Sequence, residues 1–405
     1  MIEIMIALVI AFLLLLGLSR IYVSSKVAFN LQNGMSRVQE NARFALQYLE
    51  DHTRMVGYLG CGSDTTLSKL STVGSLPFLN HLAACTYAAT GTPKPCAIPI
   101  VQPDLDTSAN FPIRFQRKIE GFEYTGASTD NAQPALGAAG DWSPALPADI
   151  AGKAVKGSDV LVLRLISEES TLVTGAFDIN AGSFTVADGG FVKANGIYAI
   201  TNCIGPRADI FQATSGGATP TAEAGNPLRL LDGSGSTWLG GIAQNFGADG
   251  TTLNAEVHKA EYLAVYVGLD NADSSVPALK VSQFSAGAGG WTTTASDLLD
   301  NVESLQVLYG VDEAGNGAVT NYVKANDAWF TSGGADAASI DAKWLTVVSV
   351  RLALLLRSPD AVSEDTSDVK RQTFGVADAK MMRPNDHRFR AVYDTTIALR
   401  NRLID

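Results

Sequence analysis

The spacing of apolar side chains divides the start of the chain into two halves. Residues 1–23 are apolar at nearly every position, with Glu3 as the one carboxylate. Residues 24–56 repeat apolar side chains at steps of three, four or seven, which places them on one stripe of a helix. The stripe comprises Val27, Leu31, Met35, Val38, Ala42, Ala45, Leu49 and Val56. Because no proline occurs before Pro77, the pattern predicts one helix over residues 1–56, about 80 Å long at 1.5 Å per residue.

The two halves of this helix predict different surroundings. Residues 1–23 are long enough to cross the hydrocarbon core of a membrane, which takes about 20 residues, or to pack in a bundle of similar helices. Residues 24–56 are amphipathic and are expected to lie on a globular body. A cleaved signal peptide over residues 1–25 is the alternative. No basic segment precedes the apolar run, and a cut there would divide the amphipathic pattern. We therefore expect the helix to be retained.

Glu3 lies inside or at the edge of the apolar half. An unpaired carboxylate in the hydrocarbon phase costs about 2.5 kcal/mol or more. One interpretation places Glu3 at the level of the lipid headgroups. The other pairs it with a cationic partner, such as the N-terminal amine of a neighbouring copy or subunit. The second interpretation makes Glu3 a candidate assembly residue.

Residues 57–405 have the pattern of a turn-rich β body. Short apolar or alternating runs are separated by glycine, proline, asparagine and aspartate, and the chain contains 38 glycines. The predicted strands are residues 119–124, 159–166, 183–186, 196–203, 208–213, 255–268, 304–310, 344–356 and 389–399. The predicted fold class is therefore α+β, with a long N-terminal helix packed on a large antiparallel β-rich globular body.

The remaining stretches of the body predict loops and one short helix. Residues 61–115 contain repeated prolines and predict a loop-rich region. Residues 125–151 and 215–250 predict exposed excursions. Residues 295–302 predict a short helix with a serine or aspartate N-cap. No internal repeat or composition break divides the body, so residues 57–405 are predicted to form one unit after the helix.

The composition indicates a substantial core, and the net charge argues against one class of partner. The chain has 405 residues, of which 46% are hydrophobic, enough for a substantial core. Its net charge is −11, and the first 56 residues carry five basic and four acidic side chains, so the body holds the acidic excess. An acidic body argues against nucleic acid as a partner, because nucleic-acid binding needs a basic surface.

The cysteines lack the close spacing of a zinc site. They are Cys61, Cys85, Cys96 and Cys203. In an exported body they are expected to form two disulfides, and free buried thiols in a reducing compartment are the alternative. Three pairings are open. We prefer Cys85–Cys96, which closes a short loop, with Cys61–Cys203 as a second bridge from the end of the helix to the sheet.

The chain carries no recognised catalytic motif. It lacks the HExxH, GxSxG and P-loop signatures. Its four histidines are His52, His81, His258 and His387, and His52 is expected to face solvent. We predict no enzymatic activity, no cofactor and no metal.

Two polar runs were candidates for binding an ion or a partner. Residues 312–317 resemble an oxygen-rich calcium loop, but Ala314 occupies the middle ligand position, so a β-turn over the last three residues is the favoured interpretation. The second run is basic and is expected to be a solvated face, with a partner patch as the alternative. It consists of Arg383, His387, Arg388 and Arg390.

Both ends of the chain resemble one family. The start, MIEIMIALVIAFLLLLG, resembles the N-terminal segment of type IV pilins, which begin with a few apolar residues, a glutamate and an unbroken apolar helix. The continuation QENARFALQYLEDHTRMVGYLGCG, the run WLTVVSVRLALLLR and the ending TTIALRNRL resemble the PilW class of minor pilins. This sequence shows no basic leader or processing glycine and starts with Met where the family usually has Phe, so cleavage and N-methylation stay open.

The resemblance implies a low-copy subunit at or near the tip of a type IV pilus, which helps to start pilus assembly and supports adhesion and twitching motility. It implies other minor pilins and the major pilin as partners through the N-terminal helix, and a PilY-class tip adhesin. The chain would lie in the inner membrane, with its body in the periplasm, before assembly and in the extracellular pilus afterwards. The alternatives are a type II secretion pseudopilin and a membrane-tethered periplasmic enzyme or binding protein.

Overall fold

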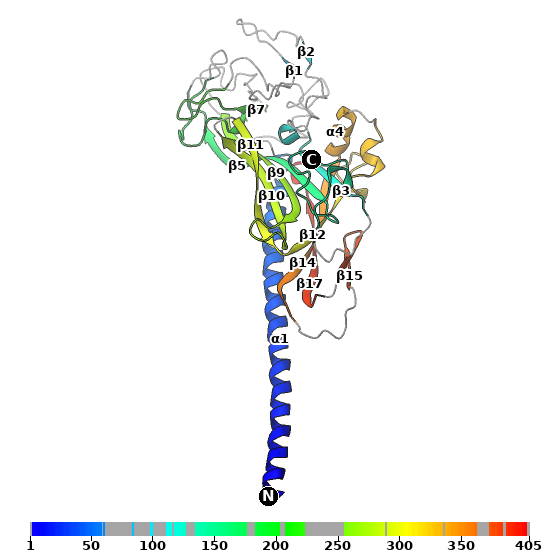
Figure 1. The fold of residues 1–405 in the computed structure, drawn as a ribbon. Coiled ribbons are helices and arrows are strands. Elements are labelled where there is room, and N and C mark those ends of the chain that lie inside the picture. The colour runs from blue at the N-terminus through cyan, green and yellow to red at the C-terminus, as the bar shows by residue number, and fades with distance from the viewer. Residues whose placement is uncertain are drawn as a thin grey trace.

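A long helix extends from a body of antiparallel strands in the computed structural model (Figure 1). The structure describes residues 2–58, 60, 83–84, 98–99, 111–115, 117–126, 134–175, 183–202, 207–222, 255–287, 290–334, 337–362, 372–383 and 386–402. The predicted α+β architecture, with the N-terminal helix packed against antiparallel sheets, is confirmed.

Helix α1 spans Ile2–Arg54 without interruption. Its first half extends beyond the body as a free rod, and its second half lies along the body (Figure 1). The buried residues of α1 all belong to the second half, and they are Gly34, Val38, Ala42, Ala45, Leu49 and Thr53. Their steps of three or four confirm the predicted stripe from Val38 onward. Leu31 and Met35, earlier members of that stripe, remain 38% and 37% exposed.

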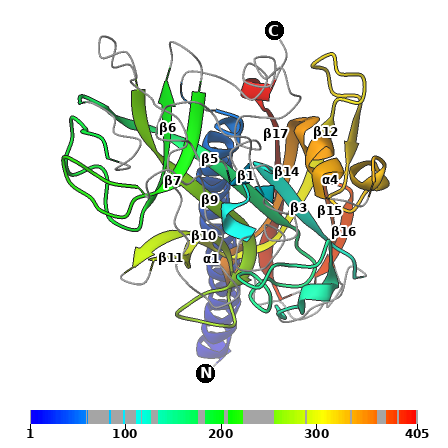
Figure 2. The ribbon, with the colours of Figure 1, turned by 90° about the horizontal axis from the view of Figure 1, so that it is seen from above.

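The larger sheet has eight strands and is antiparallel throughout. Its strands are β3 (Ile119–Tyr124), β4 (Trp142–Ser143), β5 (Val160–Leu172), β6 (Ile197–Asn202), β7 (Arg207–Gln212), β9 (Ala255–Leu269), β10 (Pro277–Gly287) and β11 (Gly290–Asp300). The main order is β11-β10-β9-β5-β3-β4, and β6 joins β9 to β7. The long strand β9 therefore organises the sheet (Figure 2).

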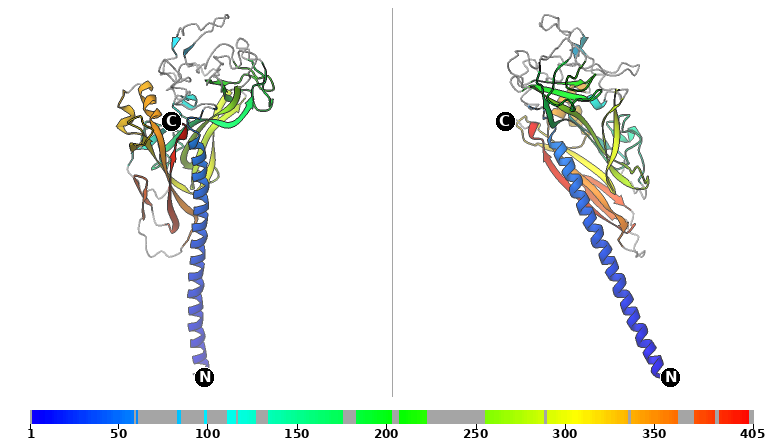
Figure 3. Two further views of the ribbon diagram at one scale, coloured as in Figure 1. Left: turned by 180° about the vertical axis from the view of Figure 1, so that it is seen from behind. Right: turned by 90° about the vertical axis from the view of Figure 1, so that its left-hand side faces the viewer.

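The smaller sheet has four antiparallel strands in the order β13-β12-β14-β17. They are β12 (Val302–Val311), β13 (Asn321–Val323), β14 (Val347–Ala361) and β17 (Arg388–Ala398). The second half of α1 lies against β14 and β17 (Figure 3). This sheet is the main support of the helix.

Short elements complete the described body. Two small antiparallel sheets pair β1 (Ala83–Ala84) with β2 (Ile98–Pro99) and β15 (Gln372–Val376) with β16 (Ala379–Arg383). A second helix, α4, spans Ala337–Leu345. The 3₁₀ turns are η2 (Phe111–Ile113), η3 (Ala139–Asp141), η4 (Ala328–Thr331) and η5 (Arg400–Arg402).

One hydrophobic core joins the helix to both sheets. The helix contributes Val38 and Leu49, the larger sheet Leu263, and the smaller sheet Leu305 and Leu354 to a single cluster of buried side chains. Burying one leucine side chain contributes about 1.5–3 kcal/mol. The second half of α1 is therefore held by the same core that holds the sheets together.

Most predicted strands are confirmed within a few residues. Those at 119–124, 159–166, 196–203, 208–213, 255–268, 304–310 and 389–399 correspond to β3, β5, β6, β7, β9, β12 and β17. Residues 183–186 make only isolated bridges. The strand predicted at 344–356 begins later than expected. Trp344 lies in α4, and the strand β14 starts at Val347.

The helix predicted over residues 295–302 is wrong. Residues up to Asp300 form β11, in which Ser296 lies opposite Val281 of β10. The ladder with β10 satisfies the backbone of this segment, and that tertiary pairing outweighs the local helical pattern. Asn301, with φ of 63°, then turns the chain into β12; asparagine tolerates this left-handed conformation.

The excursion predicted over residues 125–151 is confirmed only in part, because its described residues after 133 are partly exposed and partly packed on the sheet. Trp142, Leu146 and Ile150 are buried, and the Trp142 Nε1–H donates to the Ser158 carbonyl at 2.8 Å. A few large apolar side chains thus fold this Ala- and Gly-rich segment onto the sheet. Most of the excursion predicted over 215–250 lies outside the described residues.

Candidate assembly surface

The first half of α1 presents a continuous apolar surface. Its large apolar side chains from Ile2 to Val23 are 45–74% exposed. An 18-residue window of α1 has a mean hydropathy of 2.7 and buries none of its residues in the body. This length and composition are sufficient to cross a membrane, which is consistent with membrane anchoring.

This surface is unfavourable in water. A leucine or isoleucine side chain gains about 1.5–3 kcal/mol on burial, and a large contiguous apolar patch marks a site of interaction with protein or lipid. In the second half of the same helix, Leu49 is fully buried against the sheets. The first half has no such contact with the body among the described residues.

Glu3 lies in the first turn of this apolar surface and is exposed. Its carboxylate has no ion pair or hydrogen bond among the described residues. An acidic group at this end of a helix is favoured by the helix dipole. Pairing of Glu3 with the amine of a neighbouring subunit stays a prediction.

Gly34 marks the point where α1 meets the end of β14. A Cβ atom at Gly34 would lie 2.9 Å from Cγ1 of Val362 and 3.3 Å from Cβ of Ser358. A Cβ atom at Gly17, in the free half, would meet nothing within 4 Å. Close packing therefore requires the smallest side chain at Gly34, whereas the structure gives no such reason at Gly17.

Polar contacts fix the other end of α1. Asn401 donates through Nδ2 to the Arg54 carbonyl at 3.1 Å, and Gln283 donates through Nε2 to the Tyr48 hydroxyl at 3.3 Å. His52 was predicted to face solvent but is half-buried. Its Nδ1–H donates to the Tyr48 carbonyl at 2.8 Å, and the two rings lie 4.1 Å apart between centroids.

The basic run near residue 390 is not the predicted solvated face, because two of its arginines surround the buried carboxylate of Glu303. Arg390 donates to Glu303 at 2.9 and 3.0 Å, and Arg383 donates at 3.3 Å. Arg390 also pairs with Asp386 at 2.6 Å. Burial lowers the pKa of Arg390, but its hydrogen bonds to Asp386 and Glu303 outweigh burial and raise the pKa. Buried charges need such partners, so these arginines stabilise the body.

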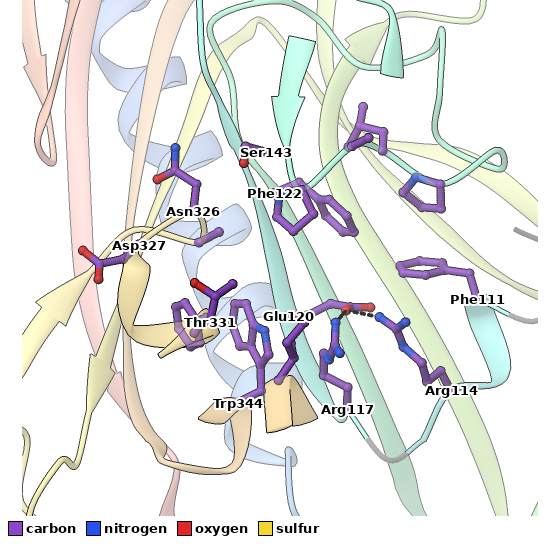
Figure 4. A pocket seen from close by; sticks show the side chains of 17 residues that line it. Phe111, Arg114, Arg117, Glu120, Phe122, Ser143, Asn326, Asp327, Thr331 and Trp344 are labelled. Carbon is purple, nitrogen blue, oxygen red and sulfur yellow. Dashed lines mark hydrogen bonds and ion pairs between the residues drawn. The ribbon is translucent and has the colours of Figure 1, made fainter. Parts of the chain in front are cut away.

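A second buried carboxylate, Glu120, lines a cavity of about 410 Å³ (Figure 4). It accepts hydrogen bonds from Arg114 at 2.6 Å and from Arg117 and Arg164 at 2.9 Å each. Burial raises the pKa of Glu120, but the three guanidinium groups outweigh burial and hold the pKa well below its usual range. Glu120 is therefore the centre of a fully charged buried cluster.

The cavity beside Glu120 has aromatic walls and partnered polar groups. Phe122 and Trp344 belong to its lining, and Arg117 also donates through Nε to Asp341 at 2.8 Å. Its lining residues include no histidine and no cysteine. Among the described residues, the two arginines and Glu120 of this lining are thus paired with one another.

The loop over residues 312–317 is a turn stabilised by Asp312. The Asp312 carboxylate accepts backbone N–H bonds from Gly315 at 2.7 Å and from Gly317 at 2.6 Å. Burial raises the pKa of Asp312, and the backbone hydrogen bonds lower it by more. In a calcium loop the Asp312 carboxylate would face the ion. Here both of its oxygens accept backbone hydrogen bonds within the turn. The favoured β-turn interpretation agrees with this geometry.

The cysteine prediction lies outside the described residues, as does His81. The disulfides among Cys61, Cys85, Cys96 and Cys203 therefore stay predictions. In the described segments, no group of three or more His, Cys, Asp or Glu side chains is placed to hold a metal ion.

The C-terminal third of the chain carries the decisive similarity. Residues 265–401 match the family model of PilW, the Type IV Pilus-assembly protein W. This match confirms the resemblance seen in the sequence, and it includes β14 and β17, on which α1 rests. Neither a curated protein nor a solved structure matches the chain. The free apolar helix and the segment that matches the PilW model, residues 265–401, are thus parts of one structure.

The sequence interpretation missed Glu120 and Glu303 as centres of charge. Both stand in strands, β3 and β12, where nearly every other residue is buried. The available signal was a glutamate next to large apolar side chains in a predicted strand, because a glutamate is almost never fully buried unless it is paired.

Proposed function

We propose that this protein is a minor pilin of a type IV pilus, present in low copy at or near the tip, which helps to start assembly and supports adhesion and twitching motility. One observation carries the proposal. The apolar half of α1 is continuous with a half that packs on β14 and β17, which lie in the segment matching the PilW family model, residues 265–401. A subunit of this plan can anchor in a membrane and later exchange lipid for the helices of other subunits.

The proposal includes partners and location. Other minor pilins and the major pilin would contact the free half of α1, with Glu3 aligning the helices, and a PilY-class adhesin would contact the body. Before assembly the chain would lie in the inner membrane with its body in the periplasm, and afterwards in the extracellular pilus. No enzymatic activity is proposed, and the match to a pilus-assembly family supports a structural role.

A pseudopilin of a type II secretion system shares the same plan, and the two are separated by an immunoblot. Fibres sheared from the cell surface are compared with the membrane fraction for this protein and for the main pilin. We expect a trace signal in the fibres, far below that of the main pilin, and immunogold label at fibre ends. Signal in the membrane alone would favour the pseudopilin, and label spaced along the fibre would exclude the tip location.

A further inference from the structure

A groove runs beside the last turns of α1, between this helix and the larger sheet. Two adjoining cavities, of about 410 and 660 Å³, form the groove and share His52, Lys259 and Glu261. Aromatic side chains, including Tyr48 and Phe284, line the first cavity. The groove therefore combines aromatic walls with charged groups at its centre.

Glu261 stands at the junction because the side chains of β9 alternate between two faces. Leu263 and Val265, on the same face of β9, pack in the core that includes α1. Glu261 comes two residues earlier, where this face leaves the core. Burial raises the pKa of Glu261, and nearby His52 and Lys259 offset burial only in part. Within the described residues its carboxylate has no hydrogen bond or ion pair.

The cations nearest the groove are already engaged. Lys259 pairs through Nζ with Glu169 at 2.6 Å. Arg54 pairs with Glu50 one turn earlier on α1. Glu261 therefore feels Lys259 only at longer range and forms no direct ion pair with a cation among the described residues.

Two more carboxylates line the groove without a partner. Asp51 projects from α1 and Glu168 from β5, and neither has an ion pair among the described residues. Ammonium and guanidinium groups bind carboxylates, and the faces of aromatic rings attract the same cations. The groove is complementary to a basic side chain.

We propose that this groove receives an arginine or lysine side chain from the helix of a neighbouring subunit. The inference rests on the proposed function, because subunits bundled through the first half of α1 also lie beside its second half. This chain's own α1 exposes Arg37 and Arg43, which have no ion pair among the described residues. A neighbour with arginines at the same helical positions would present the same charges to the groove. Arg43 precedes Asp51 by eight residues, about 12 Å along the helix. A neighbouring helix with an arginine at position 43 would therefore bring it level with Asp51 of this chain if the two helices were displaced along their axes by this distance.

The test uses the full-length protein in fibre-bearing cells. Glu261→Gln removes the central charge, and Glu313→Gln, in the exposed turn after β12, is the matched control. We expect Glu261→Gln to lower the amount of the protein in sheared fibres about tenfold and Glu313→Gln to leave it unchanged. Because the burial of Glu261 is offset only in part by His52 and Lys259, glutamine should leave thermal unfolding unchanged or raise its midpoint, which separates lost docking from misfolding.

A photo-crosslinking amino acid in place of Glu168 identifies the occupant. We expect an adduct with another pilus subunit, mapped to a peptide with an exposed lysine or arginine, and no adduct from the same probe in place of Glu313. Wild-type levels of Glu261→Gln in fibres, or an adduct only with a non-pilus protein, would overturn the inference and leave the proposed function intact. Absence of the wild-type protein from sheared fibres would instead overturn the proposed function, and this inference with it.

Discussion

The two halves of α1 have the same secondary structure and opposite surroundings. From Gly34 to Thr53 the helix buries a stripe against two sheets, whereas from Ile2 to Val23 its apolar side chains are exposed on every side. The difference follows from the pattern of residues. A helix with one apolar stripe is stabilised by packing that stripe on one surface. A helix that is apolar on all sides needs an apolar environment on all sides. The packed half therefore fixes the subunit's own fold, and the free half is available for a membrane or for other helices.

The largest expected effect comes from the carboxylate in the free half. Glu3→Ala should leave the folded body intact and lower incorporation into sheared fibres by at least about tenfold, because it leaves the N-terminal amine of the neighbouring subunit without its proposed partner among apolar helices. Glu40→Ala, in the packed half and exposed, is the matched control and should incorporate normally. Quantitative immunoblots of fibre and membrane fractions measure both. Normal incorporation of Glu3→Ala would remove the proposed assembly role of Glu3.

The next effect concerns a carboxylate that the body pairs internally. Glu120→Gln should lower the free energy of unfolding at pH 7 by about 3–5 kcal/mol, because it leaves three buried arginines short of a counter-charge. Asp394→Asn breaks the exposed pair with Arg351 and should cost about 1 kcal/mol or less. Denaturant titration in detergent measures both. Equal effects of the two variants would contradict the buried cluster.

Glu120 also predicts the direction of the pH dependence. Its folded-state pKa lies well below the usual range, so its stabilising contribution is present above the unfolded-state pKa of about 4.3. The contribution is lost as the pH falls through that value toward the folded-state pKa. Denaturant titrations at pH 7 and at about pH 3 should show a smaller acid-induced loss of stability in Glu120→Gln than in wild type. If Glu120→Gln and wild type lost the same free energy of unfolding between these two pH values, other groups would be responsible for the acid sensitivity.

A pair of leucines compares the two halves directly. Leu49→Ala should lower the free energy of unfolding by about 2–5 kcal/mol, because it opens a cavity in the core. Leu13 is 61% exposed in the free half, and Leu13→Ala should change the same quantity by about 0.5 kcal/mol or less. Chemical unfolding in detergent tests this difference. Similar losses for both variants would mean that the free half is also held by the body.

The smallest expected effect comes from a pair of glycines. Gly34→Leu should lower the free energy of unfolding by about 1–3 kcal/mol, since the new side chain meets Val362 and Ser358. Gly17→Leu should leave stability unchanged or raise helix stability by about 1 kcal/mol, because nothing surrounds that position. Thermal unfolding followed by circular dichroism measures both. A destabilising Gly17→Leu would contradict the free rod.

The sequence predicted the helix and its packed stripe because local periodicity determines both. The same holds for β5 and β9, whose apolar runs are long. The prediction for residues 295–302 was wrong because local periodicity fits a helix as well as a strand there. Only the pairing with β10 makes this segment part of β11. The prediction that Leu31 packs on the body was also wrong. Leu31 continues the apolar stripe in the sequence, but its side chain is partly exposed in the structure.

The charged groups of the candidate sites could be predicted only in part. Glu3 stands out because its neighbours in sequence are all apolar. Glu303 and Arg390 are 87 residues apart in the chain, so only the pairing of β12, β14 and β17 brings them together. The groove around Glu261 likewise depends on how α1 crosses the larger sheet, which no local pattern records.

The proposed docking of the free half of α1 among the helices of other pilus subunits can be tested directly. Phe12, 66% exposed in this half, is a suitable position for a photo-crosslinking amino acid in fibre-bearing cells. The account predicts adducts with other pilus subunits in sheared fibres, mapped to their apolar N-terminal helices. Crosslinks to lipid alone, in cells whose fibres contain no adduct, would contradict it.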